Sequence, residues 1–339
     1  MAARAPTRFD RAVVTAVLCA GYLASVAFSV FMSRPVGEGA ALWTANGFLA
    51  GALILLPGAW RLGAAAICLV SQVVISLAVG DGFARSLLYP LVNLIEAGLA
   101  AYLALEFCGA RARRLSLRKL TLILLGAVIP AAAVGGAVGA GIGVMVGRKG
   151  FLSLWLDWAA PGGLGMAIVL PAVLLVARSL HYRDFERSGL EMFSLLGGVS
   201  ALTLAVFLQG ELPLFFLIFP ALTLVAFRLG PAGAAVAGFL VAVIALPLTL
   251  LGHGPSTLAA GLDLTGRVRL TQLFVAAALF TTVATAGALA DQARMRRLMI
   301  GRDRAARGAR LRAREAESLA AEALEVAVAA PPVRRAALT

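Results

Sequence analysis

Ten apolar runs, uncharged except for Glu96, divide residues 12–290, and they constrain the fold of this chain more than any other feature. A helix needs about 20 apolar residues to cross the ~30 Å core of a bilayer. The runs lie at 12–33, 39–60, 62–80, 86–105, 120–147, 158–177, 192–210, 212–227, 232–251 and 270–290. The chain is 61% hydrophobic, with a mean hydropathy of +0.92 that a soluble domain does not need. We expect an all-α, polytopic transmembrane helical bundle of eight to ten spans.

The run 212–227 is the least regular of these segments. It is short, only Glu211 separates it from the run before, and Pro213 and Pro220 lie inside it. Proline interrupts helical hydrogen bonding. The sequence therefore leaves open whether this segment spans fully, kinks or re-enters the membrane.

Lysine and arginine are divided unevenly between the two sets of loops. With a cytoplasmic N-terminus, the inner segments hold 24 of these residues and the outer loops hold 6. Because cytoplasmic loops are enriched in Lys and Arg, we expect a multi-pass protein of the bacterial plasma (inner) membrane with both termini in the cytoplasm. The net charge of +13 then follows from topology, and the lipid bilayer rather than nucleic acid is the expected partner.

Two segments of the chain resemble each other. The pattern GE, AWRLG, GDG covers Gly37–Gly82, and GE, AFRLG, GHG covers Gly210–Gly254. Arg61 and Arg228 fall at matching inner turns, so both copies cross the membrane in the same direction. This predicts two parallel repeats of about four helices, joined by the fifth and sixth helices. Chance recurrence of short Gly/Arg turns is the alternative.

The composition changes after residue 290. Residues 291–325 are rich in Ala, Arg and Glu and favour a helix, without a clean heptad pattern. We divide the chain into a cytoplasmic N-terminus (1–11), a transmembrane domain (12–290), a cytoplasmic helix of the signalling type (291–325) and a disordered tail (326–339).

No catalytic signature is found in the sequence. GxSxG, HExxH and P-loop motifs are absent, and the three cysteines and two histidines have no metal-ligand spacing. We expect no enzyme activity, no metal site and no cofactor.

Glu96 is the most unusual residue within the apolar runs, because it lies near the middle of 86–105. A charge at the bilayer centre costs roughly 2.5–3.5 kcal/mol. Asn93 lies one turn earlier on the same helix face. Asn46 and Asn93 are each the eighth residue of a span that runs inward, which places both about 11 Å below the outer surface. We expect these three polar side chains to meet.

Most other polar residues of the spans also belong to the outer half, which predicts a cavity that opens outward. The candidate ligand-binding residues are Trp43, Asn46, Asn93, Glu96, Asp157 and Gln272. The alternatives stay open: Asn46, Asn93 and a protonated Glu96 would equally form a packing cluster, the tryptophans would anchor the interface, and Asp157 would begin a solvated helix.

Four glycines at spacing four predict a smooth helix face for close packing: Gly135, Gly139, Gly143 and Gly147. The partner is another helix of the bundle or a second protomer.

Five motifs, in order, resemble the bacterial membrane-associated sensor domain family of the first type (MASE). They are LWTANGFLAGALIL (42–55), NLIEAGLAAYL (93–103), GLGMAIVLPAVLL (163–175), LPLFFLIFPALTLVAFRLGPAGAAVAG (212–238) with GHGP (252–255), and QLFVAAA (272–278). The resemblance covers about residues 12–290. It implies an integral sensor region that feeds a cytoplasmic diguanylate cyclase, phosphodiesterase or histidine kinase, as in cyclic-di-GMP or two-component signalling.

The sequence departs from this family in two places. Family members often carry an acid before the glycine of the GLGM-like motif, where this chain has Gly162-Gly163. We also expect no output domain in the residues that follow the last span. We therefore expect a sensory module that transmits through its last span into the helix near Asp291 and Arg294. Its partner would be a separate signalling protein, or a second copy of the chain. A small-solute transporter and a structural subunit of a membrane complex are the alternatives.

Overall fold

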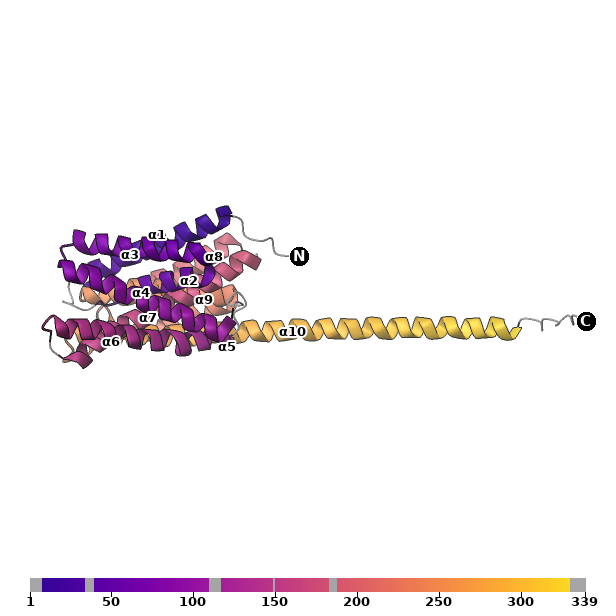
Figure 1. The fold of residues 1–339 in the computed structure, drawn as a ribbon. Helices are drawn as coiled ribbons and strands as arrows, with labels where there is room; N and C mark the ends of the chain where they lie inside the picture. The colour runs from indigo at the N-terminus through magenta and orange to yellow at the C-terminus, as the bar shows by residue number, and fades with distance from the viewer. Residues whose placement is uncertain (1–7, 34–39, 110–116, 149, 183–187, 330–339) are drawn as a thin grey trace, which may run out of the picture. The chain divides into compact units, whose positions relative to one another are not determined.

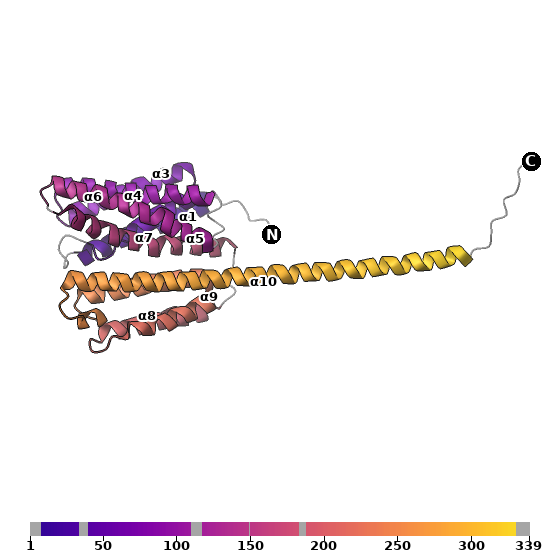
Figure 2. The ribbon, with the colours of Figure 1, turned by 90° about the horizontal axis from the view of Figure 1, so that it is seen from below.

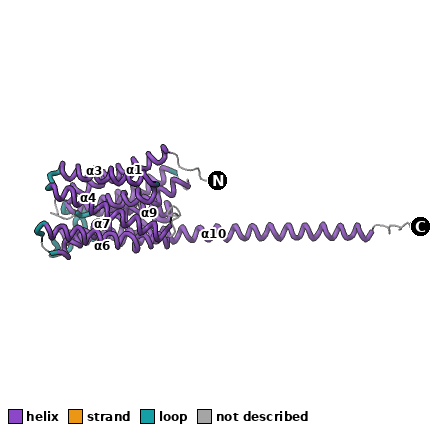
Figure 3. Tube along the Cα trace, viewed as in Figure 1, coloured by secondary structure: helices purple, strands orange, loops and turns teal. Residues whose placement is uncertain are grey.

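The computed structural model describes residues 8–33, 40–109, 117–148, 150–182 and 188–329. All regular structure in these ranges is helical (Figures 1 and 3), which confirms the predicted all-α fold. The helices are α1 (Arg8–Ser33), α2 (Ala45–Leu55), α3 (Gly58–Ala78), α4 (Phe83–Cys108), α5 (Leu117–Ile123), α6 (Ile129–Met145), α7 (Phe151–Tyr182), α8 (Gly189–Leu208), α9 (Ile218–Leu250) and α10 (Leu264–Ala329). A π-helical turn, η3 (Leu124–Val128), joins α5 to α6, and 3₁₀ turns form η4 (Leu214–Leu217) and η5 (Pro255–Leu258).

Eight helical segments of the described chain are long and apolar enough to cross a membrane. The chain divides into two compact units, Met1–Leu289 and Ala290–Thr339. The first unit is the helical bundle of a multi-pass membrane protein. The second contains the remainder of α10, whose side chains from residue 292 to residue 325 are exposed almost throughout where they are described.

The chain reverses direction inside α9. Gly230 has φ +67° and ψ −163°, which is not helical, and Pro231 follows it. The rings of Phe219 and Phe274 are 5.8 Å apart, while the Thr249 hydroxyl lies 3.1 Å from that of Thr271. A straight helix would separate residues 219 and 249 by about 45 Å. Since both contact the same turn of α10, the two halves of α9 form a hairpin, as the separate runs 212–227 and 232–251 predicted.

α2 is shorter than the predicted span. Within the run 39–60, α2 takes only the 11 residues Ala45–Leu55, because Pro57 precedes α3 and the described residues 40–44 are not helical. Backbone that is not helical is tolerated within a membrane where protein surrounds it. Ala41 and Leu42 are buried, and the Trp43 amide donates to the Pro161 carbonyl at 3.1 Å. The predicted 22-residue helix is therefore wrong in length.

α7 packs against both halves of the bundle. Leu170 and Leu174 belong to an apolar core with α1, α2, α4 and α6, whereas Ile168 and Val169 belong to a second core with α8, α9 and α10. Figure 2 shows α8 and α9 together, apart from the group that contains α3, α4 and α6. The two cores thus meet at α7.

Several other boundaries differ from the predicted runs. α7 begins at Phe151, so the segment that contains Asp157 lies within the helix and not at its start. α10 continues to Ala329, beyond the predicted start of the tail at 326, and residues 330–339 lie outside the described part of the chain. The two arginine turns of the repeat also differ in register. Pro57 separates the helices before Arg61, whereas Gly230 separates them after Arg228.

Candidate functional site

Three polar side chains of α2, α4 and the segment before α2 form a chain of hydrogen bonds. Trp43 Nε1 donates to Asn46 Oδ1 at 3.1 Å, and Asn46 Nδ2 donates to Asn93 Oδ1 at 3.2 Å. Asn46 is fully buried and Asn93 almost so. Because lipid offers no partner to an amide, each amide needs the other for its burial. The structure thus brings together the two asparagines that the sequence placed at equal depth.

Glu96 lies one turn further along α4 and has a relative exposure of 0%. Its Oε2 accepts a hydrogen bond from Trp158 Nε1 of α7 at 3.3 Å, and its Oε1 has no partner among the described residues. A Cβ on Gly135 would lie 2.7 Å from Oε2, and a Cβ on Gly162 would lie 2.8 Å from Oε1. The two glycines therefore make the room that the carboxyl group occupies. Asn46 also interacts with this carboxyl group, which links Glu96 to the two asparagines.

The glycine face of α6 packs against α7 and Glu96 in the bundle. Gly139 lies against the Trp158 indole and Gly143 against Leu154, where an added Cβ would come within 2.7 and 3.0 Å. Gly147 does not share this face. It follows the end of α6 with φ +88° and has no atom within 4 Å of an added Cβ. Its role is a turn that needs positive φ.

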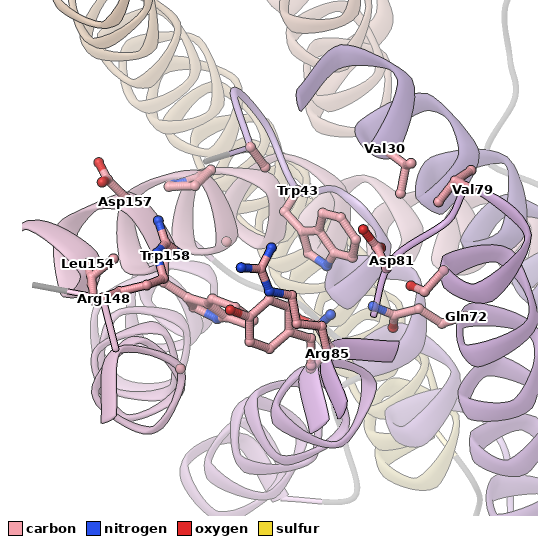
Figure 4. A pocket seen from close by; sticks show the side chains of 17 residues that line it. Val30, Trp43, Gln72, Val79, Asp81, Arg85, Arg148, Leu154, Asp157 and Trp158 are labelled. Atoms are coloured by element: carbon pink, nitrogen blue, oxygen red, sulfur yellow. The ribbon is translucent and has the colours of Figure 1, made fainter. Parts of the chain in front are cut away.

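A cavity of about 270 Å³ lies next to this network, at the end of the bundle where α1, α3 and α6 finish and α4 and α7 begin. Figure 4 shows Trp43, Arg85 and Trp158 around the same space, from different parts of the chain. Its walls carry polar and charged side chains: Gln72, Ser76, Asp81, Arg85, Tyr89, Asn93, Arg148 and Asp157. Glu96 lies behind the floor, since Asn93, Trp158 and Gly162 line the cavity and contact or adjoin it.

Asp157 and Gln272, the remaining predicted site residues, connect the cavity wall to α10. Asp157 Oδ1 accepts from Arg269 Nη2 at 2.9 Å, and Gln272 Nε2 donates to the Ala41 carbonyl at 2.7 Å. Within the described residues, neither of these two side chains is hydrogen-bonded to Glu96. Asp291 is half-buried in the second unit, and the Arg294 side chain falls outside the described part of the structure.

Three cavity residues were not predicted from the sequence: Gln72, Arg85 and Tyr89. Arg85 and Tyr89 precede Asn93 at intervals of four residues, so the α4 face that carries Glu96 continues to the mouth of the cavity. This four-residue spacing predicts that Arg85 and Tyr89 share the helix face of Asn93. Gln72 accepts a hydrogen bond from Tyr22 at 2.5 Å and is an amide inside an apolar run, as Asn46 is. A buried amide inside an apolar run predicts a polar partner at Gln72 as it does at Asn46.

Close backbone approaches join two of the sequence motifs. A Cβ on Gly165 would fall on the Trp43 carbonyl oxygen, and a Cβ on Gly47 would come within 2.6 Å of the Val169 side chain. LWTANG and GLGM are therefore adjacent in space, and their glycines allow α2 and α7 to touch.

The family model MASE1 matches residues 12–294 of this chain. No curated protein and no solved structure matches this chain. The family match confirms the resemblance carried by the five motifs, and it covers the whole bundle. It also agrees with the helical composition and the membrane-spanning lengths described above. The chain belongs to the MASE1 family of membrane-associated sensor domains.

Proposed function

We propose that this membrane sensor domain detects a ligand or membrane partner in the cavity beside Glu96 and transmits the change through α10. The observation that supports this most is the pair of links from the cavity wall to α10. Asp157 lines the cavity and pairs with Arg269, and Gln272 bonds the carbonyl of Ala41, next to the cavity-lining Ala40. A shift of either wall would therefore act directly on α10.

The signal then passes along α10. This helix is continuous from Leu264 to Ala329, and its later part is exposed and rich in arginine. We infer that a cytoplasmic or membrane signalling protein, or a second copy of the chain, docks on the helix beyond Asp291. Two alternative dispositions of the helix would form the switch.

We place the domain in the bacterial inner membrane with the cavity facing outward and both termini in the cytoplasm. The distribution of 24 against 6 Lys and Arg residues supports this orientation. A cysteine at Thr265 should react with an impermeant thiol reagent added outside intact cells. A cysteine at Ser188 should react only after the membrane is opened, and the reverse pattern would overturn the orientation. The native cysteines are buried and add little background.

The packing below Glu96 favours a sensor over a transporter. The next buried residues of α4 toward the other end are small and apolar: Ala97, Ala100, Ala101 and Ala104. They pack in the core of the first half and provide no polar path beyond the cavity floor. A transporter needs such a path in at least one state.

A reporter fusion tests the proposal. Residues 1–325 are joined to a diguanylate cyclase domain, and cyclic-di-GMP is measured in cells together with the abundance of the fusion in membranes. Glu96→Gln and Arg269→Gln should each change the output at unchanged abundance. Glu106→Gln, an exposed acid on the same helix as Glu96, should not. Equal output from all four proteins would exclude coupling between this cavity and α10.

A further inference from the structure

Two of the three cysteines meet between α1 and α3, although they are far apart in the sequence. The thiols of Cys19 and Cys68 interact with each other. Both thiols are free and buried, and both belong to the apolar core that contains α1, α2, α4 and α6. α1 and α3 pack side by side in this core. The fold thus brings two free thiols together in an apolar environment.

The turns before and after the two cysteines show the same pairing of α1 with α3. One turn later in both helices, the Tyr22 hydroxyl donates to Gln72 Oε1 at 2.5 Å. One turn earlier in both helices, Thr15 and Ala64 line one groove together. Residues three or four positions apart lie on the same face of a helix. The two cysteines therefore lie opposite each other on this seam, between two other contacts of the same helices.

A disulfide suits this pair of thiols better than a metal ion does. Within the described residues, no third His, Cys, Asp or Glu joins them to form a metal site. A disulfide is uncharged, so its burial among apolar side chains avoids the cost of a buried charge. It also requires a close approach of the two backbones. The small side chains of Thr15 and Ala64 on the same seam allow such an approach.

The position of the pair indicates which oxidant can reach it. Both cysteines lie near the middle of apolar segments long enough to span the membrane, Asp10–Val30 and Gly58–Ala78. A water-soluble oxidant would have to enter the hydrocarbon core to meet them. One turn away, a groove of about 280 Å³ lies between the two helices, with walls that are mostly apolar: Thr15, Ala59, Trp60, Gly63, Ala64 and Ile67. The groove and the depth of the thiols both favour an oxidant that dissolves in lipid.

We propose that Cys19 and Cys68 form a reversible disulfide when a lipid-soluble quinone enters the groove beside them. Two S–H bonds break and one S–S bond forms, while the quinone takes up the two electrons and two protons and leaves as the hydroquinone. Quinones accept the electrons of thiol oxidation in bacterial membranes.

The disulfide would act on the cavity through the next turn of the seam. Gln72 lies one turn after Cys68, is bonded to Tyr22 of α1, and lines the proposed sensor cavity. A covalent bond between α1 and α3 would therefore change the position of a cavity wall. The inference goes beyond the proposed function and does not rest on it, because the disulfide forms whether or not the cavity binds a ligand.

The test uses the purified full chain in lipid nanodiscs, with decylubiquinone as the oxidant. After denaturation, free thiols are counted from the mass of maleimide added to the chain. The untreated chain should show three thiols, the oxidised chain only that of Cys108, and dithiothreitol should restore all three. Cys19→Ala and Cys68→Ala should each keep both remaining thiols under the same treatment. Cys108→Ala, the matched control, should lose both of its thiols.

A second pair of variants tests the groove. An added Cβ at Gly63 meets no atom within 4 Å, so Gly63→Leu should narrow the groove without a clash at Cβ. Oxidation by decylubiquinone should slow at least tenfold. Gly98→Leu, at an equally open position on α4, should oxidise at the native rate.

Thermal unfolding shows which variants are folded before their thiols are counted. If one cysteine variant does not fold, the other and Cys108→Ala still decide which thiols pair. A treated chain that keeps all three thiols, or a disulfide-linked dimer on a non-reducing gel, would overturn the proposed pair. Equal oxidation by a sulfonated benzoquinone, which stays in water, or a native rate in folded Gly63→Leu, would overturn the proposed oxidant and its route. None of these measurements uses the reporter output, which tests the sensor function separately.

Discussion

The two segments that resemble each other in sequence bury different kinds of side chain in the bundle. The first, with α2 and α3, packs beside α4 and contributes Trp43 and Asn46 to a polar network under a cavity. The second, the α9 hairpin, packs around Phe207, Phe215 and Phe274, whose rings lie 4.8–6.2 Å apart. In the first half, buried polar side chains lie next to a cavity. In the second half, aromatic rings fill the core. The first half therefore has a polar cavity wall, whereas the second half has an aromatic core that includes Phe274 of α10.

The largest effect is expected where the backbone of the first half touches α7. Gly165→Ala would place a methyl group on the carbonyl oxygen of Trp43. The neighbour is backbone and has little freedom to move, so the cost should exceed the ~1–3 kcal/mol of an overpacked core. We expect loss of monodisperse protein in size-exclusion chromatography.

Gly98→Ala is the matched control for that substitution, because no atom lies within 4 Å of the added Cβ. Alanine also favours a helix over glycine by about 0.5–1 kcal/mol. The control should therefore be as stable as the native chain or slightly more so. Native-like behaviour of Gly165→Ala would show that the first half is not held by this contact.

The next effect is expected in the aromatic half. Phe207→Ala empties a fully buried position. Removal of a lipid-inaccessible ring leaves a cavity that costs on the order of 2 kcal/mol, and the larger penalty of transfer from water does not apply inside a membrane. The unfolding temperature in detergent should fall clearly. The tryptophan fluorescence of the folded fraction should stay unchanged, because Trp43 and Trp158 line the cavity in the other half. Phe216→Ala, at a ring that is 60% exposed, should change little. A changed tryptophan spectrum in folded Phe207→Ala would contradict the division between the two halves.

A smaller change in stability is expected for Glu96→Gln. Glutamine keeps the shape of the side chain and an acceptor for Trp158, so the unfolding free energy should change by no more than about 1 kcal/mol. The reporter output should nevertheless be lost. If the variant instead fails to accumulate as folded protein, Glu96 is a packing residue and the first half has the same structural role as the second.

The smallest change in stability is expected at the link between the halves. Asp157 and Arg269 are 35% and 52% exposed, and an ion pair of this kind contributes at most about 1 kcal/mol. Arg269→Gln and Asp157→Asn should leave unfolding almost unchanged, while both alter the reporter output. The exposed pair of Arg228 and Glu191, 2.7 Å apart, is the matched control. Breaking it should change neither measurement, and an equal effect on output would remove the special role of the Asp157 link.

Parts of the site could be predicted from helical spacing alone. The equal depth of Asn46 and Asn93 follows from their positions in two spans, and the amides are hydrogen-bonded at 3.2 Å. The isolated acid at 96 likewise required a partner within the bundle. What spacing could not provide was the identity of that partner. Trp158 approaches Glu96 only because Gly135, Gly139 and Gly162 lack side chains where α4, α6 and α7 meet.

The sequence by itself determined the all-α fold, a bundle of eight to ten apolar segments and the polar character of one half. Each of these depends on the length of apolar runs or on periodicity along one helix, which are local properties. Only the tertiary structure decided that the chain before α2 packs against α7 through Trp43 and Pro161, and that Asp157 pairs with Arg269. These features depend on contacts between residues far apart in the sequence, 112 positions in the case of Asp157 and Arg269, and no local pattern encodes such contacts.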